Sequence, residues 1–413
     1  DHGKHISLPR GCLDDVRMLL QEHESQLELE DLRYAGEPIE ANFLGELTEA
    51  QLQAVTAMAE QDNGIIVAPP GFGKTVLGTY LIAERKCNTL VLVHRQPLLE
   101  QWRSQIGTFP GHDAKSIGQI GGGKRKLTGQ IDVAMIQSLS RKDAVDGMVA
   151  EYGQVIVDEC HHLPAISFER VLSEVKARYV VGLTATPQRR DGHQPIIHMQ
   201  IGPVRFRADP RTQAAQRTFN HRLVVRTTGF EPPVQASDIT IQELYGQLVT
   251  DERRNEQIIN DVLQTMEEGR SPILLTERKE HLEQLSERLK GFVRHIVILQ
   301  GGRSAKQRRA VEQQLASIPD DEERLLLATG RYVGEGFDDA RLDTLFLALP
   351  VSWKGTLVQY AGRLHRLHPG KREVRIVDYV DSKVPMLARM FERRRVGYRA
   401  MGYRENDAEA FLE

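Results

Sequence analysis

Lys74 and Thr75 close a glycine-rich turn that lies between an apolar run and a stretch of helical periodicity. Gly71 and Gly73 give this turn its flexibility. In such a turn, backbone N–H groups and the N-terminus of the following helix cradle phosphate groups. The lysine reaches the β- and γ-phosphate oxygens of a nucleotide, and the adjacent hydroxyl binds Mg²⁺. The first motif position is Ala68 where the general pattern has Gly, so the segment alone also fits an ordinary glycine-rich turn.

Two adjacent acids, Asp158 and Glu159, follow the apolar run VIV. The carboxyl ends of strands are where ligands bind in open α/β sheets. We expect Asp158 to hold Mg²⁺ and Glu159 to accept a proton from the attacking water. Acids at a strand end also occur as caps, but together with a phosphate-binding turn they favour a nucleotide site. We assign His161 to coupling and not to zinc, because His161 and His162 have no further partners at metal-ligand spacing.

Arg363 and Arg366 are three residues apart, which predicts that they share one face of a helix. An arginine delivered to a γ-phosphate stabilises the transition state by ~10³ to 10⁵ in rate. We therefore expect both to act as arginine fingers, supplied by a second domain to a nucleotide that the first domain holds. A basic solvated helix face is the alternative.

These groups need a sheet to position them, and the sequence pattern predicts two such sheets. From residue 63, and again after residue 240, short β-branched runs alternate with helical periodicity. Such runs flanked by helices indicate parallel strands buried on both faces. The second series is expected to open with one long helix over 241–266. The fold class is therefore α/β, with two tandem doubly wound parallel-sheet domains and a small N-terminal α+β appendage.

Domain boundaries follow from this pattern. Residues 1–45, expected as strand, helix and strand, are too few to bury a core alone and should pack on the first domain. The first domain is expected over 46–225, a linker over 226–240, and the second domain over 241–413 with a basic C-terminal helix.

Composition limits the class of protein. The chain has 413 residues, of which 40% are hydrophobic and 27% charged, as in globular proteins. Its formal net charge is −3, so a polyanionic partner must be argued from local features. No run approaches the ~20 apolar residues of a membrane span, and the three cysteines form no CxxC pair. We expect a cytoplasmic protein without a membrane partner. Because the chain begins with Asp and not Met, we expect a processed product, a tagged form or an excised part of something longer.

The motifs together resemble those of superfamily 2 DExH-type helicases. The matching segments, in order, are GFGKT (71–75) as motif I, DECH (158–161) as motif II, TAT (184–186) as motif III, TG (329–330) with GEGFD (334–338) as motif V, and QYAGRLHR (359–366) as motif VI. The resemblance covers about residues 47–380. It implies that the two domains are RecA-like and that the cofactors are ATP and Mg²⁺.

The same resemblance implies further nucleotide contacts. Gln51 is placed on the adenine base, with Gln53 as its rival and a plain helix-surface glutamine as the alternative. Asp338, next to Gly336 and Phe337, is placed on the ribose. Gln359 is placed near the γ-phosphate, although Asp338 and Gln359 also fit as helix caps.

The segments VLVHRQPLLEQW (91–102) and DVAMIQSL (132–139) resemble motifs Ia and Ib, and together with motif V they imply residues that bind the nucleic-acid strand. Arg95, Gln137 and Thr329 are expected to contact the sugar-phosphate backbone, which every step of a translocating motor shares. Thr184 and Thr186 are expected to couple nucleotide and strand.

Two basic segments each have two possible interpretations. The loop 121–126 fits phosphate contact or a solvated turn equally. The tail helix 386–404 interleaves arginines with Phe391, Tyr398 and Tyr403, which suits either nucleic acid or docking of the helix on its own domain.

Residues 188–191, QRRD, are similar to the Arg-Glu-Asp element of XPB-like helicases, with Arg190 where that family has Glu. The chain also looks like the helicase part of bacterial mobile-element and conflict-system proteins, in which the motor is joined to primase or nuclease modules. These resemblances imply an ATP-dependent DNA translocase or helicase, with DNA and such modules as partners. An RNA helicase is one alternative. A nucleotide-gated DNA clamp, or a recruitment module for a nuclease or primase, is another.

Overall fold

Two compact units make up the chain. The computed structural model describes residues 5–107, 117–141, 144–160, 165–185, 194–209, 219–232, 240–301, 305–330, 339–351, 354–366 and 368–406. Unit 1 is Asp1–Ala208 and unit 2 is Asp209–Glu413. Each unit has its own large sheet between helices, which confirms the predicted α/β fold class with two parallel-sheet domains.

Unit 1 contains a sheet in the order β10-β1-β9-β8-β2-β5-β3-β4, in which only β3 and β4 pair antiparallel. Its strands are β1 Asn63–Val67, β2 Thr89–Val93, β3 Gly118–Gly121, β4 Lys124–Lys126, β5 Ile131–Met135, β8 Gln154–Asp158, β9 Tyr179–Thr184 and β10 Val204–Arg207; β6 Ser140–Arg141 and β7 Ala144–Val145 form a separate ladder. Strands β2 and β8 are buried along their whole length, as the β-branched runs predict.

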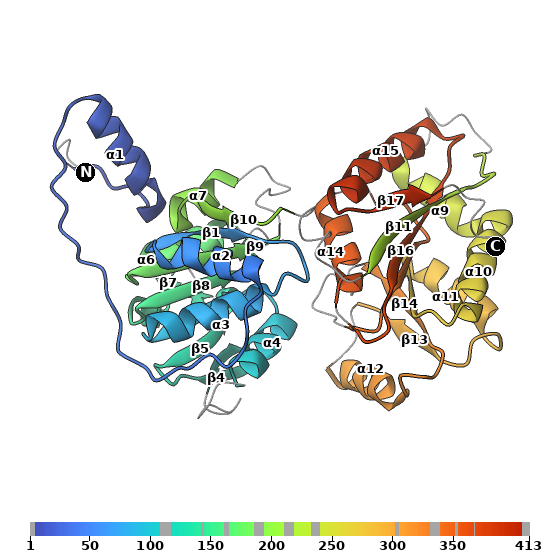
Figure 1. Cartoon of the computed structure of the whole chain (residues 1–413), viewed down its shortest axis with the longest axis horizontal. Coiled ribbons are helices and arrows are strands. Elements are labelled where there is room, and N and C mark those ends of the chain that lie inside the picture. Colours follow the sequence, from blue (N-terminus) through green and yellow to red (C-terminus); the bar gives the residue numbers. More distant parts are fainter. Residues whose placement is uncertain are drawn as a thin grey trace. The chain divides into compact units, whose positions relative to one another are not determined.

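Helices cover both faces of this sheet. The helices of unit 1 are α1 Leu13–Glu22, α2 Glu49–Ala59, α3 Lys74–Arg85, α4 Gln96–Ile106, α5 Ile136–Leu139, α6 Ala165–Glu174 and α7 Gln194–Ile201, with 3-10 turns η1 Arg10–Cys12 and η2 Gly147–Ala150; α1 has no buried residue. Met58, Leu81 and Trp102 place α2, α3 and α4 in the core on one face. Phe168 and Ile201 place α6 and α7 on the other. Figure 1 shows α2 and α3 lying together across the sheet.

The N-terminal segment differs from expectation. Its described part forms η1 and α1 but no strand, and the chain after α1 runs extended across unit 1 (Figure 1). Tyr34 and Pro38 make isolated bridges to Ala177 and Cys87. The prediction of a strand on either side of α1 is therefore wrong for both strands, because the described residues before α1 form no bridge and those after it make two single bridges and no ladder.

Unit 2 contains a parallel sheet in the order β13-β14-β12-β15-β16-β11-β17. Its strands are β11 Asn220–Thr227, β12 Pro272–Thr276, β13 Ile296–Leu299, β14 Leu325–Thr329, β15 Thr344–Leu347, β16 Glu373–Val380 and β17 Arg404–Asn406. Because β11 pairs with β16 from Asn220 to Thr227, it belongs to the second sheet. The domain boundary therefore lies at 208/209, earlier than the expected linker 226–240.

The helices of unit 2 are α9 Ile241–Thr250, α10 Glu252–Glu267, α11 Lys279–Leu289, α12 Ala305–Ser317, α14 Lys354–Leu364 and α15 Pro385–Ala400. Leucine and valine side chains of α10 and α11 pack on one face of the sheet, and those of α12 and α14 on the other. The single long helix expected over 241–266 is two helices. Asp251 has an extended backbone and its side chain caps α10 by accepting from the Arg254 N–H at 2.8 Å.

None of the helices in the described part of the chain is long and apolar enough to cross a lipid bilayer.

Candidate functional site

The phosphate-binding turn lies between β1 and α3, as expected. Gly71 and Gly73 have φ of 81° and 89°, in the left-handed region that favours glycine. The Ala68 N–H donates to the carbonyl oxygen of Thr184, 2.9 Å away, which fixes the start of the turn against the end of β9. The N-terminus of α3 therefore opens directly onto the turn, and its free N–H groups form a site for an anion.

Lys74 and the two acids meet at the carboxyl end of the sheet. Lys74 Nζ lies 3.2 Å from Glu159 Oε1, and both side chains are largely buried. Asp158 ends β8, which is separated from β1 only by β9. Glu159 has φ of 47°, a strained conformation for a residue with a side chain. The structure thus brings together the three residues on which the sequence predicts the chemistry.

Asp158 is held by two hydrogen bonds. The indole Nε1–H of Trp102 donates to Asp158 Oδ2 at 2.8 Å, and the Glu159 backbone N–H donates to Asp158 Oδ1 at 2.9 Å. Burial, together with the neighbouring Glu159 carboxylate, raises the pKa of Asp158 to about 6. Sequence reasoning did not find Trp102, because its contact with Asp158 depends on how α4 packs on the sheet.

These residues suit a magnesium ion. Among the residues that the structure describes, no group of three or more His, Cys, Asp or Glu is arranged around a metal position. Mg²⁺ in nucleotide sites does not need one, because one or two carboxylates share it with phosphates and waters. Asp158 supplies a buried carboxylate whose ionised form a divalent cation would stabilise, and Thr75, in the first turn of α3, supplies a hydroxyl.

Gln51 joins α2 to the phosphate-binding turn. Its Nε2 donates to the Phe72 carbonyl oxygen at 2.7 Å, and its Oε1 accepts from the Thr48 N–H at 2.9 Å. A Cβ on Gly73 would lie 2.6 Å from this Nε2. Gln53 is exposed on the surface of α2. Between the two glutamines, the structure places Gln51 against the nucleotide turn.

Thr184 is buried at the end of β9, beside Ala68. The remaining predicted positions of the nucleotide and coupling sets, His161, Thr186, Gly336 and Asp338, lie outside the described residues. Their roles stay predictions.

The residues of unit 1 that are predicted to bind the nucleic-acid strand lie after the ends of neighbouring β-strands. Arg95 is the N-cap residue of α4, directly after β2. Gln137, exposed in α5 after β5, donates from Nε2 to the carbonyl oxygen of His94 at 3.1 Å. Because β2 and β5 are adjacent in the sheet, this bond ties the two predicted contacts together. The basic loop 121–126 is a β3–β4 hairpin in which Arg125 pairs with Asp146 at 2.6 Å.

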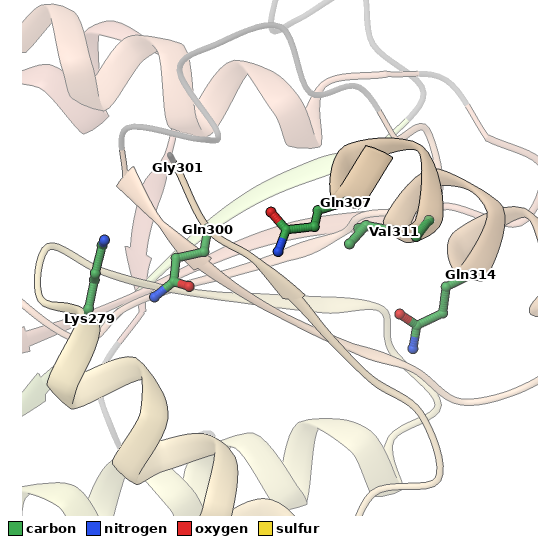
Figure 2. Close-up of a pocket in the computed structure, with 7 residues that line it drawn as sticks. Lys279, Gln300, Gly301, Gln307, Val311 and Gln314 are labelled. Atoms are coloured by element: carbon green, nitrogen blue, oxygen red, sulfur yellow. The ribbon is translucent and has the colours of Figure 1, made fainter. Parts of the chain in front are cut away.

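Thr329 ends β14 in unit 2 and is buried. Its hydroxyl accepts from the Gly301 N–H at 3.3 Å. Gly301 borders a cavity of about 510 Å³, lined by Lys279, Gln300, Gly301, Gln307, Ala310, Val311 and Gln314. Figure 2 shows Lys279, Gln300 and Gln307 around it. A polar cavity beside Thr329 was not predicted, because its residues come from three separate elements.

Gln359 and Arg363 lie on α14, half-buried. Arg366 lies two residues beyond the helix, which ends at Leu364. The prediction that both arginines share one helix face is therefore wrong for Arg366. Lys371 holds this turn: its Nζ is 2.9 Å from the Arg366 carbonyl oxygen and 3.1 Å from that of Leu364.

Three side chains hold the segment 348–351 that leads into α14. Arg254 of α10 donates to the Ala348 carbonyl oxygen at 2.6 Å, Tyr245 of α9 to that of Pro350 at 2.7 Å, and Arg394 of α15 to that of Val351 at 3.3 Å. Both arginines are also ion-paired in the core, with Asp381 and Asp378 respectively. We name these three side chains the carbonyl clamp.

The tail helix α15 docks on its own unit. Phe391, Tyr398 and Tyr403 are buried, and Arg394 is paired with Asp378 at 2.7 Å. The aromatic residues are therefore core residues and not a surface for bases. Arg389, Arg393 and Arg399 remain exposed.

Residues 44–189 match the family model described as type III restriction enzyme, res subunit (ResIII). The chain is 31% identical to "DNA 3'-5' translocase XPB2" of Sulfurisphaera tokodaii over 209 residues, 51% of this chain and 46% of that protein. It is 26% identical to "Probable helicase D10" of Escherichia phage T5 over 324 residues, 77% of this chain and 68% of that protein. The chain thus spans about half the length of the first of these relatives.

The fold is similar to that of Dbp5 from S. cerevisiae, solved bound to RNA and ADP BeF3. The TM-score is 0.62 at 13% identity, over 89% of this chain and 92% of that chain. At this identity the likeness concerns the fold alone.

Proposed function

We propose that this chain, an XPB-like superfamily 2 helicase, uses ATP hydrolysis to translocate on DNA. The family model and the named relatives confirm the resemblance that the motifs carry. The observation that carries the proposal is the meeting of Lys74, Asp158 and Glu159 at the carboxyl end of the first sheet.

In the proposed mechanism, Lys74 binds the β- and γ-phosphates and leaves its ion pair with Glu159. Glu159 then accepts the proton of the attacking water, and its strained backbone keeps the carboxylate at the end of the turn. Asp158 and Thr75 hold Mg²⁺, which neutralises phosphate charge when bound. Gln51 holds the turn through the Phe72 carbonyl oxygen, and we propose that it also contacts the adenine base.

Unit 2 supplies the remaining groups. We propose that Arg363 and Arg366 stabilise the transition state and that Gln359 lies near the γ-phosphate. Asp338 takes the ribose, with Gly336 beside it. Because these groups are on a separate unit, hydrolysis requires that the two units close on the nucleotide.

The strand is held by backbone contacts in both units. Arg95 and Gln137 provide the grip of unit 1, tied together through His94. Thr329 and the polar cavity beside it provide the grip of unit 2, where glutamine amides and Lys279 suit a phosphodiester. Thr184, Thr186 and His161 couple the nucleotide to this grip.

DNA is favoured over RNA because the relative from Sulfurisphaera tokodaii is named a DNA translocase. Backbone contacts do not by themselves distinguish the sugars, so an RNA helicase is the second candidate. A nucleotide-gated clamp that recruits a nuclease or primase module is the third.

Substrate class is tested by the rate of ATP hydrolysis with single-stranded DNA, duplex DNA and RNA in parallel. We expect DNA of either form to raise the rate at least several-fold, because a strand that spans both units favours closure. Stimulation by RNA alone would favour the RNA helicase. The absence of stimulation by DNA or RNA would contradict both the DNA translocase and the RNA helicase.

A further inference from the structure

We propose that Trp102 is a positioning residue that orients the Asp158 carboxylate for Mg²⁺ and connects it to the strand-binding end of α4. The inference rests on the proposed function and adds a role for a residue outside the phosphate-binding turn and the DECH segment.

The hydrogen bond between Trp102 and Asp158 is buried at both ends. Trp102 is 0% exposed and Asp158 is 4% exposed. The indole Nε1–H lies 2.8 Å from Oδ2, while the Glu159 N–H lies 2.9 Å from Oδ1. A buried indole N–H needs an acceptor, and a buried carboxylate is stabilised by donors. With one donor on each oxygen, the rotation of the carboxylate is fixed.

The chain makes room for the indole ring next to the phosphate-binding helix. A Cβ on Gly78, in α3, would lie 2.3 Å from Trp102 Cη2 and 3.4 Å from Leu183 Cδ1. α3 begins at Lys74. The missing side chain at Gly78 therefore lets the ring of Trp102 pass between α3 and the sheet to reach the end of β8.

α4 connects this bond to the proposed grip on DNA. Its N-cap residue is Arg95, and Trp102 lies two turns further along the helix, at ~10 Å by the rise of an α-helix. A DNA strand that binds Arg95 and moves α4 also moves the indole ring of Trp102 relative to Asp158. Coupling of this kind is reciprocal, so occupation of the cation site must alter DNA affinity by the same factor.

The test uses the full chain and two variants. Trp102→Phe removes the N–H donor and part of the ring. Trp102→Phe/Gly78→Ala lacks the donor too, but its added methyl group refills space that Trp102 Cη2 vacates. Thermal unfolding of both variants reports packing separately from the site. The site itself is measured by the Mg²⁺ concentration that half-saturates binding of a fluorescent ATP analogue.

We expect both variants to need ~10-fold or more Mg²⁺ than the wild type, as is usual when a partner of a metal-binding group is lost. Recovery of the wild-type Mg²⁺ requirement in the double variant would show that Trp102 acts by packing alone and would overturn the proposal. An unchanged requirement in Trp102→Phe would overturn it as well.

A second arm measures DNA affinity with and without the Mg²⁺ complex of a non-hydrolysable ATP analogue. We expect the wild type to respond to the nucleotide and both variants to lose most of this response. Trp102 and Trp353 are the two tryptophans of the chain. Should both variants fail to fold, Trp353→Phe leaves Trp102 as the one position for β-(3-benzothienyl)alanine. This analogue keeps the ring shape without the N–H. A wild type that does not respond contradicts the proposed function, whereas equal responses in wild type and variants contradict only the role of Trp102.

Discussion

Lys74 and Glu159 face each other at 3.2 Å across the end of the phosphate-binding turn. In the proposed mechanism, this ion pair keeps the ammonium group of Lys74 where phosphates bind. A nucleotide that takes over Lys74 then releases the Glu159 carboxylate from the pair, so that it can act as the base. The two residues were predictable, because motif spacing places each at the carboxyl end of a strand. Trp102 was not, because it lies 56 residues from Asp158 in the sequence and meets it only through packing.

We expect Lys74→Ala and Glu159→Gln to fail in different ways. Loss of Lys74 removes the charge that pairs with the phosphates, so ATP affinity and turnover should both fall. Glu159→Gln keeps the shape of the site but removes the base, so hydrolysis should slow by ~10² to 10⁴ while ATP still binds. Nucleotide affinity and ATP-dependent DNA affinity distinguish the variants. If Glu159→Gln lost ATP binding as completely as Lys74→Ala, the assignment of the base would be wrong.

At the level of elements, α14 carries Gln359 and Arg363, and Arg366 lies two residues beyond its end. These are three of the groups that we propose unit 2 contributes. The sequence predicts a helix here, because Arg363 and Arg366 are three residues apart. It does not predict that the helix ends at Leu364, because the end is set by Lys371, which lies five residues beyond Arg366 and holds the last carbonyl groups. The break at Asp251 was missed because helical sequence lies on both sides of it, and only the extended backbone of Asp251 separates the two helices.

The carbonyl clamp gives a prediction at this scale. Tyr245→Phe removes the hydrogen bond to the Pro350 carbonyl oxygen and keeps the ring, so the segment 348–351 and α14 should be less firmly placed. We expect kcat of ATP hydrolysis to fall several-fold with little change in KM, because the nucleotide is bound mainly by unit 1. Tyr34→Phe is the matched control, since that hydroxyl bonds only Glu37 in an exposed position of unit 1. Equal kcat values for the two variants would show that the carbonyl clamp has no role in ATP hydrolysis.

For the whole molecule, the fold class and the tandem arrangement were predictable from alternating strands and helices, but the boundary was not. The segment 220–227 has a strand-like sequence that fits either sheet, and only its pairing decides. It lies between β16 and β17, so unit 2 is built from residues on both sides of the expected linker.

Two fragments test this boundary. Residues 209–413 should fold cooperatively, because they contain the complete second sheet. Residues 241–413 lack β11 and should lose cooperative unfolding, since β16 and β17 are then left without the strand between them. Circular dichroism and denaturant unfolding compare the two fragments. A stable 241–413 fragment would restore the boundary expected from the sequence.

We propose that ATP hydrolysis powers movement of this protein along DNA. This movement is measured most directly by displacement of streptavidin from the biotinylated end of a DNA strand, with strand separation followed in the same reaction. We expect the wild type to displace streptavidin only while it hydrolyses ATP, and Glu159→Gln to bind the DNA without displacing streptavidin. A wild type that hydrolyses ATP on DNA but leaves streptavidin in place would contradict translocation and favour the nucleotide-gated clamp.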